Sequence, residues 1–398
     1  PSPIHVEALP TIQPTAQTAV TPPSPTNPQP AGLPSASPAT ATSTQERATP
    51  LPESVALPPD TVVGLSIDDF FEESYKQLLL RNPEKLTSLG IAGSYGRRND
   101  QLNDLSDTYI RETQELEIAI LDLLRSYDRD QLTAEQQISY DVYEWYLGDL
   151  VRGHAFTYHN YPVHHFIGSY QDELIRLLTE LHPLANRQDA EDYLSRLVQV
   201  DEQVAQLLVG LKKREEIGVI PPRFIVDMTV GNLRDLSRSG ARATPFYTAF
   251  DEALAAQEGM GDADREALLA EAEEAIDGSV IPAFAALVEY FEHLQSVATP
   301  DAGAWKLPNG DAYYAYLLRN QTSTGLTPEE IHQLGLTEVA RIQAEIRDLS
   351  GKLGYSSDMG MDELMARVAE DGGYHNTEGQ AGKDALLDAY RALSLIHI

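Results

Sequence analysis

The chain has 398 residues, of which 42% are hydrophobic, and its formal net charge is −32. This length allows two or three domains with a sizeable core. The absence of cysteine excludes a disulfide scaffold, a thiolate metal site and a cysteine nucleophile, and the acidic balance argues against nucleic-acid binding. No apolar run reaches the roughly 20 residues that a membrane-spanning helix needs.

Residues 1–60 differ in composition from the rest of the chain. They contain 15 of the 25 prolines, interleaved with Thr, Ser and Ala, and only five charged residues. Such a segment cannot bury enough apolar surface to offset the entropy of ordering it. We therefore predict a disordered Pro/Thr/Ser-rich linker or stalk, with an idle tail as the alternative. Because the chain begins at Pro1 rather than Met, we expect a trimmed or incomplete N-terminus. Thr/Pro-rich stalks are common behind export signals, so we expect an extracellular or cell-envelope protein, lipid-anchored through the missing N-terminus.

From Ser66 onward the pattern is helical, which predicts a mostly α, multi-helix domain. Three helix starts carry capping signals, because Ser66, Thr133 and Thr327 are each followed three residues later by Asp, Gln or Glu. Pro328 stands at the first position of the last of these helices, where proline is favoured.

The longest regular pattern covers residues 189–218, for which we predict one helix that ends at Gly218. The stretch 264–295 is also helical in pattern, with a break predicted around Gly278–Pro282. The segment RFIVDMTV, residues 223–230, is the best strand candidate in a sequence with few alternating patterns.

Four histidines, His154, His159, His164 and His165, lie within twelve residues in HAFTYHNYPVHHFIG. A metal site would need them to converge with a carboxylate. Neighbouring aromatic residues and Pro162 favour a packed loop between helices, ahead of substrate contact and of metal binding.

Motifs that would identify an active site are missing from the sequence. No histidine is followed by glutamate, which excludes His-Glu-x-x-His, and no Gly-x-Ser-x-Gly, Walker loop or Gly-x-Gly-x-x-Gly occurs. Glu329 and His332 form one Glu-x-x-His, which is only half of a di-iron bundle motif. Glu329 also lies in a first helical turn, where an acid is expected.

Several separated blocks resemble one family, the domain of unknown function 885 family of bacterial proteins. These blocks are YEWYLGDLVRGHAFTYHNYPV, HPLANRQDAEDYLSRL, REEIGVIPPRFIVD and LPNGDAYYAYLLRNQTSTGLTPEEIHQLGLTEVARIQAEI. They occur in the order of the family, and the likeness runs from about residue 66 to about residue 390. The resemblance implies a large, mostly helical protein similar to zinc metallopeptidases of the gluzincin type.

The zinc motif of that family resembles His-Glu-x-x-Pro-Gly-His-His and lies downstream of the last block. This chain has no copy of the motif, so the resemblance assigns it no catalytic residue and no metal ligand. We expect residues 61–392 to be the N-terminal helical portion of a domain that is incomplete at the C-terminus. The resemblance also suggests residues that line or support a cleft, with simple packing or capping as the alternative: Tyr313, Tyr314, Tyr316, Thr322 and His332.

The last six residues, Leu393–Ile398, have a second explanation. They can be encoded as CTG TCT CTT ATA CAC ATC, which reads like the end of a transposon used to prepare sequencing libraries. We expect residues 393–398 to be translated adapter, a non-native tail. The alternative is the apolar end of an ordinary helix.

Two hypotheses about function follow. The first is a truncated N-terminal fragment of an exported zinc-dependent peptidase-like hydrolase, inactive alone, that binds no cofactor itself, whereas its full-length parent uses zinc on a peptide or small-molecule substrate. The second is a complete, non-enzymatic helical module on a stalk that binds peptides or cell-wall components.

Overall fold

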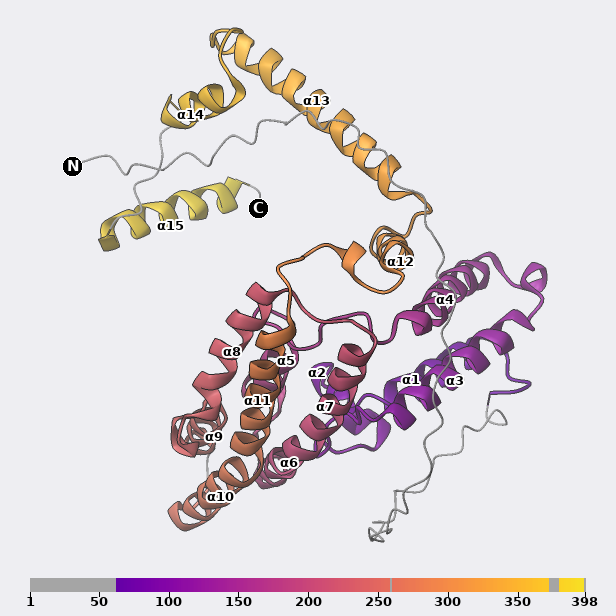
Figure 1. The fold of residues 1–398 in the computed structure, drawn as a ribbon, viewed down its shortest axis with the longest axis vertical. Coiled ribbons are helices and arrows are strands. Elements are labelled where there is room, and N and C mark those ends of the chain that lie inside the picture. Colours follow the sequence, from indigo (N-terminus) through magenta and orange to yellow (C-terminus); the bar gives the residue numbers. More distant parts are fainter. Residues whose placement is uncertain (1–61, 258–259, 372–378, 397–398) are drawn as a thin grey trace, which may run out of the picture. The chain divides into compact units, whose positions relative to one another are not determined.

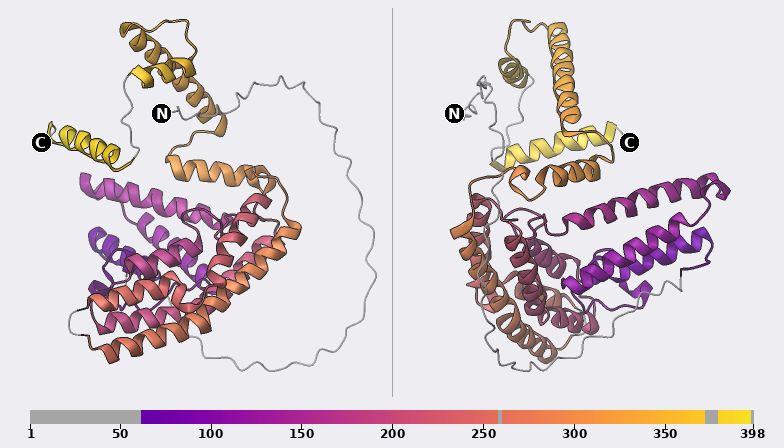
Figure 2. Two further views of the ribbon diagram at one scale, coloured as in Figure 1. Left: turned by 90° about the vertical axis from the view of Figure 1, so that its left-hand side faces the viewer. Right: turned by 45° about the vertical axis from the view of Figure 1, so that its right-hand side comes forward.

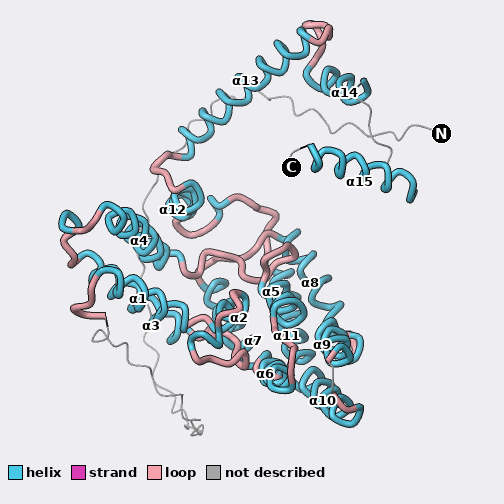
Figure 3. The backbone as a smooth tube through the Cα atoms, turned by 180° about the vertical axis from the view of Figure 1, so that it is seen from behind, coloured by secondary structure: helices cyan, strands magenta, loops and turns pink. Residues whose placement is uncertain are grey.

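The computed structural model describes residues 62–257, 260–371 and 379–396. The regular elements in these ranges are all helical and include no strand, which confirms the mostly α prediction (Figure 1, Figure 3). The stalk predicted for residues 1–60 lies outside the described residues, as does His397. Within the described part of the chain, no helix combines the length and the apolar character needed to cross a membrane.

The first core is built by three helices that lie side by side, α1 (Ile67–Leu80), α3 (Asp107–Arg125) and α4 (Ala134–Gly153) (Figure 1). Its centre is apolar and closed to solvent, with Phe70, Ile120, Leu124 and Leu147 each at most 1% exposed. Burying such side chains stabilises the packing of amphipathic helices that would be marginal alone. The short α2 (Pro83–Ser88) follows α1.

The predicted helix starts are confirmed. The side-chain oxygen of Ser66 accepts a hydrogen bond from the Asp69 N–H at 3.2 Å. Full capping boxes form between Thr133 and Gln136 and between Thr327 and Glu330. At Ser66 the return bond of a capping box is replaced by a bond from the Ser66 hydroxyl to the Asp69 carboxylate.

The second and larger core lies among seven further helices, and Figure 2 shows it from two more sides. Tyr193 is stacked on Phe250, with ring centroids 4.6 Å apart, and neither side chain is exposed. The helices are α5 (Tyr170–Arg176), α6 (Arg187–Leu197), α7 (Val200–Glu216), α8 (Arg223–Ser237), α9 (Pro245–Ala256), α10 (Asp262–Ala275) and α11 (Ile281–Val297).

The single helix predicted for residues 189–218 is wrong, because the chain divides it into α6 and α7 at Val198–Gln199. The Gln199 side chain donates to the carbonyl oxygens of Ser195 and Asp100, at 2.7 Å each, and accepts from the Leu102 N–H at 3.0 Å. These bonds satisfy backbone groups that would otherwise be unpaired at the break. Gly218 does follow the end of α7 with φ +85°, as predicted.

The strand predicted for residues 223–230 is also wrong, since these residues begin α8. A short run rich in β-branched residues is ambiguous between strand and helix. Burial decides in favour of helix, because Val226, Val230 and Leu233 recur at helical spacing and pack into the core with α11.

The break predicted at Gly278–Pro282 is instead a π-helical turn, η7 (Ile276–Val280), that joins α10 to α11. Pro282 has no N–H, and in an α-helix its ring would clash with the carbonyl four residues earlier. The wider turn makes room, and the Ile281 N–H bonds to the Ile276 carbonyl. The chain therefore remains helical through the proline. A second π turn, η5 (Leu177–Leu181), follows α5.

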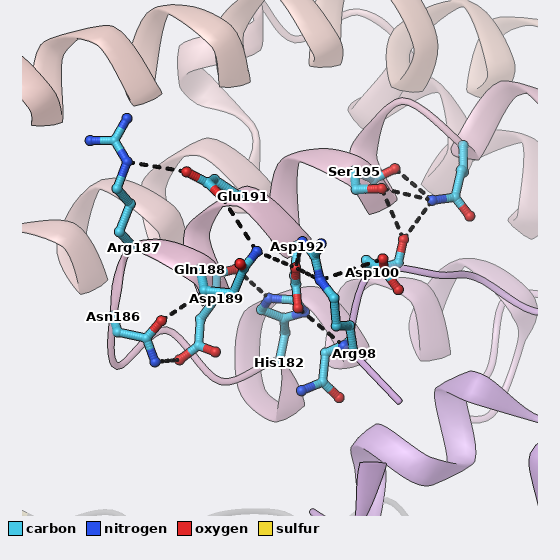
Figure 4. A network of polar contacts seen from close by, with 12 residues as sticks. Arg98, Asp100, His182, Asn186, Arg187, Gln188, Asp189, Glu191, Asp192 and Ser195 are labelled. Atoms are coloured by element: carbon cyan, nitrogen blue, oxygen red, sulfur yellow. Dashed lines mark hydrogen bonds and ion pairs between the residues drawn. The ribbon is translucent and has the colours of Figure 1, made fainter. Parts of the chain in front are cut away.

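The segment before α3 is held against α6 by a partly buried polar network (Figure 4). The Asp192 carboxylate accepts from the Arg98 Nε at 2.8 Å and from the Asn99 N–H at 3.2 Å. Arg196 is fully buried and donates to the Gln101 carbonyl oxygen at 3.0 Å and to His182 Nδ1 at 2.9 Å. The network therefore joins the N-terminal helices to the larger core through directional contacts.

The remaining helices are α12 (Gly310–Thr322), α13 (Pro328–Lys352), α14 (Met361–Asp371) and α15 (Gly379–Ile396). A short 3₁₀ turn, η4 (His154–Phe156), begins the histidine-rich loop, and another, η8 (Ala304–Lys306), precedes α12. The helical backbone of α15 includes residues 393–396, which fits either origin of the tail, so the adapter origin stays a prediction.

Candidate ligand cavity beside the histidine-rich loop

One face of α3 is joined to the loop after α4 by three side-chain hydrogen bonds. Tyr158 donates its hydroxyl to Asp107 at 2.6 Å. Gln114 Nε2 donates to Thr157 Oγ1 at 2.7 Å, and His154 Nε2 lies 2.6 Å from the Glu117 carboxylate. The α3 residues are seven and three positions apart, a spacing that keeps them near one face of a helix.

Beside this row lies a cavity of about 470 Å³, within the range typical of small-molecule sites. Its walls are α3, the histidine-rich loop and the C-terminal end of α7. The polar side chains that matter for its chemistry come from all three: Asp107, Arg111, Gln114, His154, His159 and Lys213.

The charges around the cavity are only partly neutralised. Lys213 is ion-paired with Asp107, which also accepts from Tyr158. Arg111 has no acidic partner among the described residues. Its guanidinium donates instead to the Asp107 carbonyl oxygen at 3.3 Å and to Thr108 Oγ1 at 3.5 Å. The cavity wall thus has two cationic groups, Arg111 and Lys213, and one carboxylate, that of Asp107.

Arg214, near the end of α7, supports the histidine-rich loop. Its guanidinium lies over the Tyr158 ring, 5.2 Å from the centroid, and donates to Asn160 Oδ1 at 2.7 Å and to the Thr157 carbonyl oxygen at 3.3 Å. Burial lowers the pKa of Arg214 below its ordinary value. These contacts fix the loop backbone beside the cavity.

His159 is held in one orientation, with only 8% of the residue exposed. Its Nε2 lies 2.9 Å from the Pro308 carbonyl oxygen. Because a carbonyl only accepts, Nε2 must carry a proton. Nδ1 is buried and has no hydrogen-bond partner among the described residues. A buried polar atom without a partner is costly and calls for an explanation.

The helix α12 packs against the histidine-rich loop through aromatic rings. Tyr313 lies 5.2 Å from the His159 ring and 5.4 Å from Phe156, and Tyr316 is stacked on Phe156 at 5.4 Å. The Tyr316 hydroxyl passes over Gly153, where a Cβ atom would come within 2.4 Å of it. A larger residue at the end of α4 would therefore force the Tyr316 ring to shift.

A buried carboxylate ties α12 to α4. Asp149 is 2% exposed and accepts from Asn320 Nδ2 at 2.8 Å, while Arg319 Nε lies 3.4 Å from its other oxygen. A buried acid of this kind is expected to be paired. The hydrogen bond from Asn320, together with the ion pair to Arg319, orients α12 and with it the rings that contact the loop.

Comparison with known proteins places the chain in a family. Residues 83–394 match the family described as "Bacterial protein of unknown function (DUF885)". The chain belongs to the DUF885 family. A search of curated proteins gave no match.

The DUF885 chain is also similar to a solved structure, "the putative lipoprotein from Colwellia psychrerythraea", with a TM-score of 0.71 and 20% sequence identity. The match covers 82% of this chain and 58% of the solved chain. At this identity the likeness shows a shared fold. The DUF885 chain therefore spans little more than half the length of the solved chain that it matches.

The five residues predicted to line or support a cleft are not brought together. Tyr313 and Tyr316 pack against the histidine-rich loop, whereas Tyr314 is 45% exposed. Thr322 donates to the Leu318 carbonyl oxygen at 2.7 Å at the end of α12, and His332 is exposed on α13. A cleft-lining role for these residues stays a prediction.

The four histidines of the loop divide into two pairs. His154 and His159 line the cavity, whereas the ring of His165 lies 6.4 Å from that of Phe224, and the carbonyl oxygen of His164 accepts from Gln171. The loop lies between helices, as the sequence predicts, whereas nothing in the sequence singles out Arg111, Gln114 or Lys213. Arg111 and Gln114 are three residues apart on α3, and this spacing is their only signal in the sequence. Helices carry such polar faces routinely.

Proposed function

We propose that this DUF885 chain is the N-terminal portion of an exported, zinc-dependent peptidase-like hydrolase whose metal-binding half lies outside the sequence. The observation that carries the proposal is the family match over residues 83–394 in a chain that spans 58% of its solved relative. The reaction class comes from the similarity to zinc metallopeptidases that the family resemblance implies. The substrate of the parent would be a peptide or a small molecule.

Zinc does not fit the residues at hand. Across the described ranges, no group of three or more His, Asp or Glu side chains is placed to hold a metal ion. The proposal therefore assigns the metal ligands and the catalytic base to the downstream part of the family domain. This chain would contribute helices that support the substrate-binding side.

The test begins with the DNA downstream of the last codon. We expect an open reading frame that contains His-Glu-x-x-Pro-Gly-His-His, and a protein from the extended frame that binds one zinc per chain and has peptidase activity. The present chain, expressed alone, should bind no stoichiometric zinc and cleave no peptide. A stop codon in an independently prepared clone, with no motif after it, would contradict the proposal.

The origin of the tail is tested in the same locus. Resequencing with a library method that uses no transposon should replace the codons of residues 393–398. Recovery of the same six codons would make them native.

A complete, non-enzymatic binding module remains the second candidate. It is favoured by one observation, the cavity of about 470 Å³ that this chain forms by itself. The two candidates share the proposed location, the cell envelope or its exterior, with residues 1–60 as the tether. Membrane fractionation of the producing cells, with and without removal of the first 60 residues, tests that location.

A further inference from the structure

The cavity beside the histidine-rich loop has one charged group that the fold itself does not use fully. Most of its other polar lining groups are partnered within the protein: Asp107 with Tyr158 and Lys213, Gln114 with Thr157. The exception is the Arg111 guanidinium, which has no carboxylate partner in the described part of the chain.

This group sets the chemistry that a ligand must bring. The Arg111 guanidinium only donates hydrogen bonds and is always charged. Lys213 lines the same cavity and is ion-paired with Asp107. A ligand that satisfies the site must therefore bring an anionic acceptor for the cations.

We propose that the cavity binds a small carboxylate of amino-acid or dipeptide size, with Arg111 and Lys213 contacting the carboxylate. Guanidinium–carboxylate pairs form paired, charge-assisted hydrogen bonds, which suits a single carboxylate group. The cavity volume accommodates such a ligand with ordered water.

Other ligand classes fit less well. A phosphorylated ligand would carry about two negative charges into a site that already contains Asp107, in a chain of net charge −32. A metal ion lacks the three protein ligands that it would need among the described residues. A single carboxylate matches the one cation that has no acidic partner.

The inference deepens the proposed function and rests on it for biological meaning, because peptide substrates and products end in carboxylates. Binding itself requires neither zinc nor catalysis. Failure of the downstream DNA to encode a metal motif would therefore leave the binding result unaffected, and failure of binding would leave the peptidase proposal standing.

The test is isothermal titration of the purified full chain with L-alanyl-L-alanine. We expect saturable binding in the millimolar range, and weakening of about tenfold or more when the ligand carboxylate is replaced by an amide. Arg111→Gln should weaken binding of the dipeptide to a similar degree, and it should fold normally because Arg111 is exposed.

The matched control is Arg125→Gln in the last turn of the same helix. Arg125 pairs with Glu144 away from the cavity, so its loss should leave the dissociation constant unchanged. The proposal is overturned if no saturable binding is seen, if the amide binds as well as the acid, or if Arg111→Gln and Arg125→Gln behave alike. Circular dichroism of each variant verifies folding.

Discussion

At the scale of single residues, His182 shows how a hydrogen-bond pattern fixes a protonation state. Its Nε2 lies 2.9 Å from the Asp189 carbonyl oxygen and must donate, while Nδ1 accepts from the buried Arg196. A second proton would remove that acceptor and place a positive charge beside the guanidinium. Burial lowers the pKa of His182, and with the bond to Asp189 opposing it in part and the charge of Arg196 adding to it, the pKa is about 4.

This pKa predicts a loss of stability in mild acid. Between the unfolded value of about 6.5 and the folded value of about 4, the unfolded chain binds a proton that the folded chain does not. The free energy of unfolding should therefore decrease as pH falls from 6.5 to 4, by roughly 3 kcal/mol at most from this residue. Urea denaturation at several pH values measures the slope.

The control for this prediction is a pair of variants. His182→Gln should be less stable at pH 7 but should lose stability less steeply in the same pH window. His332→Gln, on the exposed face of α13, should keep the wild-type slope. Equal slopes in His182→Gln and the wild type would contradict the assignment.

At the scale of elements, α12 shows how a short turn places a helix. Asn309 precedes it with φ +51°, in the left-handed region that asparagine tolerates. Gly310 then passes so close to η8 that a Cβ atom would lie 2.1 Å from the Ala304 carbonyl oxygen. The obstacle is backbone, which cannot rotate away as a side chain can. Glycine is thus needed for α12 to start where its rings reach the loop.

Substitution of this glycine should be costly, whereas a glycine inside a solvent-exposed helix should be replaceable. We expect Gly310→Ala to destabilise the protein by about 2–3 kcal/mol through this clash. Gly335→Ala, inside α13, meets no atom within 4 Å and should stabilise by up to about 1 kcal/mol. Thermal melts of the two variants should shift in opposite directions. A Gly310→Ala melt at the wild-type temperature would show that the turn can relax.

At the scale of the whole molecule, α13 carries an apolar stripe that faces solvent. Val339, Ile342, Leu349 and Leu353 are 53%, 45%, 58% and 74% exposed, although they recur at three- and four-residue spacing together with Ile346. Such a stripe is typical of a helix that packs against another surface. Under the proposed function, that surface belongs to the part of the family domain outside this sequence.

The exposed stripe predicts that the isolated chain associates with itself. We expect light scattering after size exclusion to show mass that increases with protein concentration, because burying the stripe between copies removes apolar surface from water. Ile342→Glu combined with Leu349→Glu should restore a monomer. Lys352→Glu on the same helix is the control and should leave the association in place. A clean monomer at all concentrations, with a sharp cooperative melt, would contradict this prediction.

The sequence by itself determined the helical class, the helix starts and the location of the histidine-rich loop. These depend on local spacing and capping at residues such as Thr133 and Thr327, which act within one helical turn. Segment 223–230 shows the limit, because its β-branched residues are ambiguous until their burial beside α11 is known.

Only the tertiary structure decided where helices are interrupted and which polar side chains meet. The break at Gln199 depends on the distant backbone of Asp100 and Leu102, and the cavity combines Arg111, His159 and Lys213 from separate elements. Nothing in the local sequence around any one of them reports such contacts. Their chemistry arises from packing, because desolvation and hydrogen-bond geometry exist only once the helices are assembled.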